Sequence, residues 1–252
     1  MKRRIERVWI AALCVAFLVG LAAGLPARLV LKLAPSALAA RVSAVDGTLW
    51  RGHARLAIAD LEPAAISWRL APSSLLVAAP RLALELTHPL GRFDGVVVLH
   101  DGSSEVVDGG LSTTLSPLAR FAGLPPGTLL GSVEAHGIDA TLDAEGIRSL
   151  TCTGTVSGVT VTGDGTPLAL GDLGVSCSDT AAGPTIAISD RGGPLVLQAS
   201  VGFAPGWRYL VDGTAGARPG APAALAQALP LLGRADGPDR IRFRYTGELL
   251  PR

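Results

Sequence analysis

Two cysteines have the clearest chemical potential in this sequence. Cys152 and Cys177 are separated by 24 residues and lie in strand-like runs, RSLTCTGTVS and LALGDLGVSC. The Gly-Asp-Gly at residues 163–165 is a turn signal between the two runs, so antiparallel strands are expected. Two such thiols predict a disulfide in an oxidising compartment, where it contributes about 3 kcal/mol. Metal binding is the weaker alternative, because no histidine lies nearby.

Catalytic and cofactor motifs are missing from the sequence. It contains no G-x-S-x-G, H-E-x-x-H, G-x-x-x-x-G-K or G-x-G-x-x-G motif, and its glycine-rich segments indicate turns. The histidines fall on separate predicted strands, at His53, His88, His100 and His136. We therefore predict a protein that is not an enzyme and has no cofactor or metal, although sequence alone leaves open a triad assembled from distant residues.

The N-terminal region predicts a membrane anchor. Residues 8–25 contain no charged side chain, and a helix of this length would extend about 27 Å, close to the thickness of a bilayer core. Residues 1–7 hold four basic side chains and one acidic one, so this end should stay in the cytoplasm. The prediction is a single-pass protein of the cell inner membrane with residues 26–252 in the periplasm.

The same apolar run raises two further questions, whether it is cleaved and whether it packs against another helix. Cleavage as a signal peptide would use the small residues near position 23, and the topology would be unchanged. Four small residues also recur at every fourth position, which places them on one helix face: Ala12, Ala16, Gly20 and Gly24. Such a face lets two membrane helices pack closely. The alternative is that alanine and glycine are simply frequent in this chain.

The remainder of the chain predicts a β-rich domain without a basic surface. Beyond residue 7 there are 18 basic and 20 acidic side chains, so nucleic acid is not an expected partner. Apolar residues alternate along short segments such as Leu82, Leu84 and Leu86, with turn signals between the segments. Residues 131–135 and 138–142 are two such segments. The expected fold is mainly β, an antiparallel and elongated, curved sheet with a few short helices.

Three short helices are predicted after prolines or a capping serine, at residues 73–77, 117–122 and 223–232. Gly-Thr-Leu occurs at residues 47–49 and again at residues 127–129. This repeat predicts a duplicated helix-plus-meander unit with a subdivision near residues 116–126, and chance is the alternative.

Two tryptophan motifs lie close together. The first is Val-Asp-Gly-Thr-Leu-Trp-Arg-Gly, with Gly47, Thr48, Leu49, Trp50 and Gly52. The second is Trp-Arg-Leu-Ala-Pro-Ser-Ser-Leu-Leu, with Trp68, Pro72, Leu75 and Leu76. Either the rings cover one end of a sheet core, or they form an exposed contact for a partner.

These two motifs resemble the type II secretion system protein N family, and the anchor and chain length are similar too. The resemblance implies an inner-membrane accessory subunit that supports export of folded proteins across the outer membrane. Its partners would be other inner-membrane and periplasmic subunits, reached through an edge strand, the tryptophans or the membrane helix. The family is distantly similar to AsmA-like envelope proteins, which implies an alternative function in binding or transferring lipid. The cysteine pair is not part of the family pattern.

Overall fold

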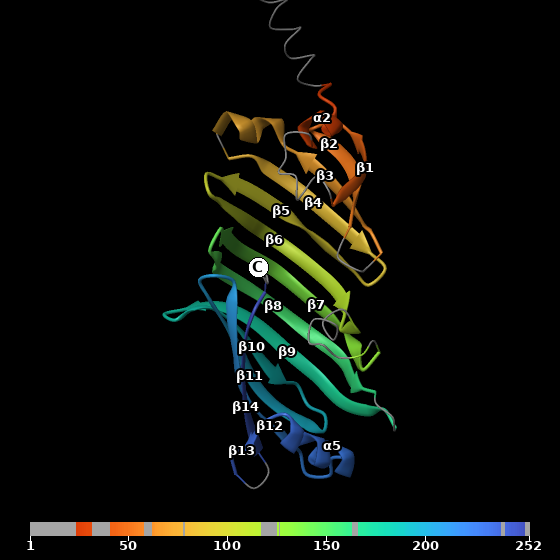
Figure 1. Ribbon diagram of the computed structural model, residues 1–252, viewed down its shortest axis with the longest axis vertical. Coiled ribbons are helices and arrows are strands. Elements are labelled where there is room, and N and C mark those ends of the chain that lie inside the picture. Colours follow the sequence, from red (N-terminus) through yellow and green to blue (C-terminus); the bar gives the residue numbers. More distant parts are fainter. Residues whose placement is uncertain are drawn as a thin grey trace, which may run out of the picture. The chain divides into compact units, whose positions relative to one another are not determined.

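The structure of this chain is a computed structural model, and it describes residues 24–31, 41–57, 62–77, 79–116, 125, 127–162, 166–237 and 240–249. In these residues the chain is mainly β, as predicted, and its strands pair antiparallel within each unit (Figure 1). The chain divides into two compact units, residues 1–88 and 89–252, which are described separately.

In its described residues, the first unit is a four-stranded meander with two short helices. The strands pair in sequence order: β1 (Val42–Gly47), β2 (Arg51–Leu56), β3 (Ala64–Leu70) and β4 (Arg81–His88). The helices are α2 (Ala27–Leu31) and the 3-10 helix η1 (Pro72–Val77). In β4, half-buried Leu82, Leu84 and Leu86 alternate with exposed residues, which confirms the one-sided pattern. A small core of Ala27, Val45 and Ala54 packs beside Trp68.

The second unit is a longer meander. Its first eight strands pair in sequence order: β5 (Gly91–His100), β6 (Ser103–Thr114), β7 (Leu129–Asp143), β8 (Gly146–Val161), β9 (Leu168–Thr180), β10 (Gly183–Asp190), β11 (Leu195–Ala204) and β12 (Arg208–Ala217). The chain then forms α5 (Ala223–Ala228), the 3-10 helix η2 (Leu229–Leu231) and the two-residue strand β13 (Arg234–Ala235). Finally β14 (Arg240–Glu248) inserts between β12 and β13.

Two predicted elements differ in detail from the structure. The segments at residues 131–135 and 138–142 are not separate strands, since a bulge near Gly137 joins them into β7. Gly137 has φ +57°, a conformation that glycine adopts without steric cost. The predicted helix at 223–232 is α5 followed by η2, whose second residue is Pro230. Proline lacks the N–H that would extend the α-helical bonding.

The sheet of the second unit has one apolar and one polar face. Directly opposed residues on successive strands from β8 to β14 form a row that we call the apolar row: Cys152, Cys177, Ile186, Val201, Val211 and Tyr245. The neighbouring residues form the polar row: Thr153, Ser176, Ala187, Ser200, Asp212 and Arg244. Because adjacent residues of a strand point to opposite faces, the two rows lie on opposite sides of the sheet.

Several predictions fall on residues that the structure does not describe. The anchor at residues 8–25 lies almost wholly outside them, including Ala12, Ala16 and Gly20, and Gly24 is the first described residue. Among the described residues, no helix has the length and apolar character needed to cross a membrane. All of the helix predicted at 117–122 also lies outside them. The subdivision near 116–126, the duplication and the elongated shape stay predictions.

Candidate functional site

The first tryptophan motif forms the turn between β1 and β2. Gly47 has φ +97°, and a Cβ there would lie 2.5 Å from the carbonyl oxygen of Arg51. A Cβ on Gly52 would lie 2.5 Å from the ring of Trp68. Only glycine fits at these two positions without displacing the backbone or the indole ring, so the spacing of the glycines follows from close packing.

Trp68 lies behind this turn and supports it. Its ring Nε1 donates to the carbonyl oxygen of Thr48 at 3.3 Å, and its ring packs against the core of the first unit. Trp50 is half-buried, and its carbonyl oxygen accepts a bond of 2.7 Å from the backbone N–H of Leu70. The motif tryptophans are thus placed by the fold, with their indoles partly covered.

The turn also holds the segment that directly follows the predicted anchor. The backbone N–H of Leu49 donates to Leu25 at 2.9 Å, and Thr48 forms a bridge with Pro26. The guanidinium of Arg28 donates to Val45 O at 2.7 Å and to Asp46 Oδ1 at 2.6 Å. We call residues 25–28 together with the 45–52 turn the clasp. It fixes the direction in which the chain enters the first unit.

The second tryptophan motif connects β3 to β4. Leu70 ends β3 with 8% of its surface exposed, and Pro72 begins η1. The buried hydroxyl of Ser74 donates to Ala71 O at 2.5 Å and accepts the backbone N–H of Arg81 at 2.9 Å. The side chains of Leu75 and Leu76 lie outside the described residues. This motif therefore shapes a strand–helix–strand connection.

The predicted cysteine pair lies at the start of the apolar row. Cys152 and Cys177 are directly opposite in β8 and β9, with Cα atoms 4.7 Å apart, and their sulfur atoms are joined. The four histidines lie on four different strands. His100 Nε2 lies 3.5 Å from Glu105 Oε2, a pair on neighbouring strands. No group of three potential metal ligands occurs among the residues in the described ranges.

A contact centred on Trp207 was not predicted from the sequence. Its indole Nε1 donates to Ala144 O at 3.3 Å, and the N–H of Gly206 donates to Glu145 O at 2.6 Å. These bonds bring the β11–β12 turn against the β7–β8 turn, 63 residues apart in sequence. Trp207 has φ +58°, a conformation uncommon for a bulky residue. The Pro-Gly at 205–206 signals a turn, but nothing in the sequence specifies its distant partner.

The β7–β8 turn is organised by one carboxylate. Asp143 Oδ1 accepts the backbone N–H groups of Glu145 at 2.7 Å and Gly146 at 3.0 Å, and Asp143 also pairs with Arg148. The bond from Arg148 is the main cause of a lowered pKa for Asp143, opposed in part by burial. The same pairing raises the pKa of Arg148. The pair holds in shape the turn that Trp207 contacts.

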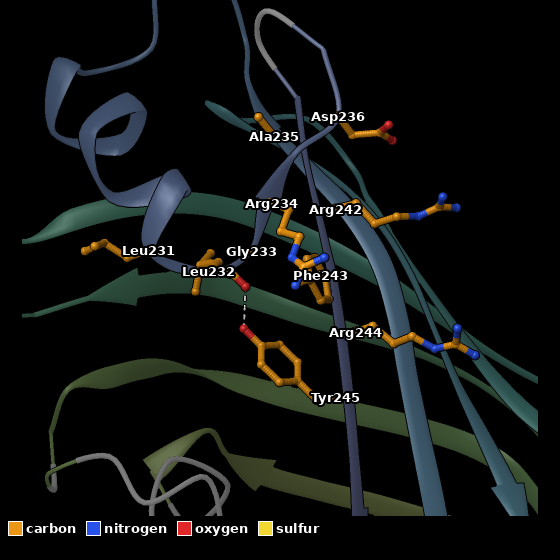
Figure 2. A pocket seen from close by; sticks show the side chains of 10 residues that line it. All are labelled: Leu231, Leu232, Gly233, Arg234, Ala235, Asp236, Arg242, Phe243, Arg244 and Tyr245. Atoms are coloured by element: carbon orange, nitrogen blue, oxygen red, sulfur yellow. Dashed lines mark hydrogen bonds between the residues drawn. The ribbon is translucent and has the colours of Figure 1, made fainter.

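A hollow of about 570 Å³ lies beside β14, at the C-terminal edge of the second unit. Figure 2 shows Arg242 and Arg244 on one side of the strand and Tyr245 on the other, where its hydroxyl donates to Leu232 O. Leu231 and Leu232 are 86% and 49% exposed. The hollow therefore has a basic side and an apolar side, and no motif in the sequence indicates it.

Comparisons with known proteins place this chain in a family. A family model described as type II secretion system, protein N, matches residues 39–244. The type II secretion system protein N of Aeromonas hydrophila is 30% identical over 274 residues, an alignment that covers 97% of this chain and 99% of the relative. No solved structure matches. The matched range includes both tryptophan motifs, the cysteine pair and most of β14, and the chain belongs to the type II secretion system protein N family.

Proposed function

We propose that this chain is a non-enzymatic accessory subunit of the type II secretion system, anchored in the cell inner membrane by residues 8–25. Its residues 26–252 lie in the periplasm, and its partners are other inner-membrane and periplasmic subunits. Family membership supports a role in the secretion system. The finer placement rests on the charge asymmetry around residues 8–25.

The clasp is the observation that carries this proposal. A flexible linker would leave an anchored domain free to reorient, whereas a segment tied to the fold holds it in one direction. Here five contacts tie residues 25–28 to the β1–β2 turn within a few residues of the apolar run. The disulfide is consistent with the oxidising periplasm.

Deletion and complementation test the secretion role. We expect a strain lacking this chain to retain secreted enzymes in its periplasm, and the full-length chain to restore their release into the medium. The matched control is a chain in which residues 8–25 are replaced by a cleavable signal peptide, which exports the same domain without an anchor. Full restoration by this control would contradict an anchored function, and normal release in the deletion strain would contradict any role in secretion.

Reporter fusions test the topology. Alkaline phosphatase fused after residue 252 should be active, since this enzyme requires export, whereas β-galactosidase fused at the same place should be inactive. The mass of the purified chain separates an anchor from a signal peptide. Retention of residues 1–25 is expected, and loss of about 2.7 kDa would assign them to a cleaved signal.

The apolar face of the second unit favours lipid binding as a second candidate function. From Cys152 to Val211 the side chains of the apolar row are only half-buried, and Tyr245 is 51% exposed. Burial of this surface by acyl chains would be favourable at about 25 cal/mol per Å².

Native mass spectrometry of the full chain tests the lipid function. If the apolar face binds lipid, Val201→Glu should remove the bound mass, whereas Ser200→Glu on the opposite face should retain it. Lipid associated only with the membrane helix would persist in both variants. That outcome, or the absence of any bound lipid, would contradict this candidate.

A further inference from the structure

We propose that the outer edge of β14 binds an extended segment of a partner subunit as an added strand, in which acidic and apolar side chains alternate. This inference rests on the proposed role as a secretion subunit, and it adds the contact surface and the chemistry of the partner. Three features of β14 carry it: unpaired backbone groups, a basic side and an apolar side.

The first feature is the direction of the backbone groups. The N–H of Leu249 donates to Trp207 O at 2.8 Å, so the odd-numbered residues of β14 bond to β12. The N–H of Asp236 donates to Arg240 O at 2.8 Å, so the even-numbered residues face the outer edge. Backbone directions alternate along a strand, and those of Arg244 and Thr246 must therefore point outward.

These outward groups extend past the end of β13. This strand pairs only with Ile241 and Arg242, and within the described residues no other strand pairs with the outer side of β14. A sheet edge of this kind offers N–H and C=O groups in the spacing that an extended peptide needs.

The second feature is a line of arginines. Arg240, Arg242 and Arg244 alternate along β14 and project from the polar face. Asp212 is the carboxylate facing the latter two, with Oδ1 3.9 Å from Arg242 Nε and Oδ2 3.8 Å from Arg244 Nε. The two arginine side chains are still 62% and 67% exposed, so Asp212 compensates them only in part.

An added strand would place one of its residues directly opposite Arg244. Opposed Cβ atoms in a strand pair lie about 5 Å apart, and opposite charges there are favourable whereas like charges are not. The residue on that side of the partner strand should therefore be aspartate or glutamate, and the same argument applies two residues away toward Thr246 or Arg242.

The third feature is the apolar side of the same edge. Phe243 and Tyr245 stack with ring centroids 6.0 Å apart, and the exposed Leu231 and Leu232 line the same hollow (Figure 2). The intervening residues of the partner strand would continue the apolar row, so they should be apolar or aromatic.

A second copy of this chain is a less suitable occupant. Its β14 would bring three arginines and only one acidic residue, Glu248, to an edge that already has an excess of positive charge. A partner strand with acidic residues at alternate positions complements the arginines along its whole length.

Peptide binding to the full chain in detergent tests this inference. The probes are three fluorescein-labelled nine-residue peptides, one with alternating glutamate and valine, one with alternating lysine and valine, and one with glutamates and valines in two separate blocks. Fluorescence anisotropy should give a Kd for the alternating acidic peptide at least tenfold lower than for the other two. Equal binding of the acidic peptides would show attraction to negative charge without strand addition, and would overturn the proposal.

Two variants locate the binding. Thr246→Pro removes an outward N–H and leaves every bond to β12 in place. It should raise the Kd of the alternating acidic peptide at least tenfold. Arg242→Glu with Arg244→Glu should reverse the preference, so that the lysine peptide binds more tightly, an outcome that misfolding cannot produce. The control is Arg55→Glu with Arg69→Glu, on exposed positions of β2 and β3. It makes the same charge change and should leave the Kd of each peptide unchanged.

Sedimentation of the full chain in detergent tests whether a second copy occupies the edge. A monomer is expected, and a dimer that Thr246→Pro dissociates would assign the edge to a second copy and overturn the proposal. Unchanged peptide binding in both edge variants would also overturn it. Neither result would alter release of secreted enzymes in the complementation experiment, so failure of this inference is distinguishable from failure of the proposed function.

Discussion

Each of the two units is stabilised by its own kind of internal contact. In the first unit, one turn concentrates the contacts: two glycines, the Trp68 indole and Arg28 meet within the clasp. In the described part of the second unit, the contacts are spread along the paired strands β5 to β14, with the disulfide and the Trp207 bonds as additional ties. A short contiguous motif is therefore the signature of a tight turn, whereas regular alternation is the signature of an extended sheet.

The disulfide is expected to give the largest effect, and it should be confined to the second unit. Changing Cys152 and Cys177 to serine together should lower the free energy of unfolding by about 3 kcal/mol, because the loop they close gains freedom when unfolded. Hydrogen exchange should increase in β8 and β9. Cys14→Ser is the matched control and should change nothing. Equal exchange with and without a reducing agent would show that the pair contributes no constraint.

One glycine in each unit, Gly52 and Gly202, should respond to alanine in opposite directions. Gly52→Ala places a Cβ 2.5 Å from the Trp68 ring, so we expect a loss of about 1–3 kcal/mol, seen as faster hydrogen exchange in β1–β3. At Gly202 in β11, no atom lies within 4 Å of the position that a Cβ would occupy, and Gly202→Ala should stabilise by about 0.4–1 kcal/mol.

This pair of variants separates local packing from sheet propensity. If Gly52→Ala and Gly202→Ala changed the hydrogen exchange of their own strands equally and in the same direction, the clasp would not be a tightly packed turn. A further check is the segment at residues 25–28, which should become accessible to protease only in the Gly52 variant.

The sequence predicted those features that depend on neighbours along the chain. Alternation at Leu82, Leu84 and Leu86 was sufficient to identify β4, and the two strand-like runs around Cys152 and Cys177 were sufficient to suggest their pairing. Each of these signals is contained in a few residues or in one hairpin.

Features that depend on distant contacts could not be predicted in the same way. The Gly-Thr-Leu-Trp motif is visible in the sequence, but its contacts with Pro26 and Arg28 depend on a pairing with residues about 20 positions away. The position of β14 between β12 and β13 depends on strand order, which no local pattern in the sequence specifies. An exposed arginine on a central strand and one on an edge look identical in sequence.

The indole hydrogen bond should give a smaller effect within the clasp. Trp68→Phe keeps an aromatic ring against Ala54 and Val45 but loses the donor to Thr48 O, so we expect a loss of about 1 kcal/mol. Hydrogen exchange at Leu49 and Thr48 reports on it. Trp207→Phe is the equivalent change in the second unit, where it removes the bond to Ala144 O. A change at the β1–β2 turn in the Trp207 variant would contradict the assignment of each bond to its own unit.

The smallest effect should come from Asp143, and it should depend on pH. The folded protein lowers the pKa of this carboxyl, so it stabilises the β7–β8 turn in its ionised form. That contribution is fully present above the ordinary carboxyl pKa of about 4, and it is lost as the pH falls through the lower folded value. The protection of the Glu145 and Gly146 amides, whose N–H groups donate to Asp143, should therefore fall on acidification below pH 4, measured relative to the intrinsic exchange rate at each pH. Asp143→Asn retains an acceptor but cannot titrate, so its exchange at these amides should be faster at neutral pH and lack this acid-dependent step. If the step persisted in the variant, another carboxylate would control the turn that Trp207 contacts, and the hydrogen bonds to Asp143 would be a consequence of the turn and not its cause.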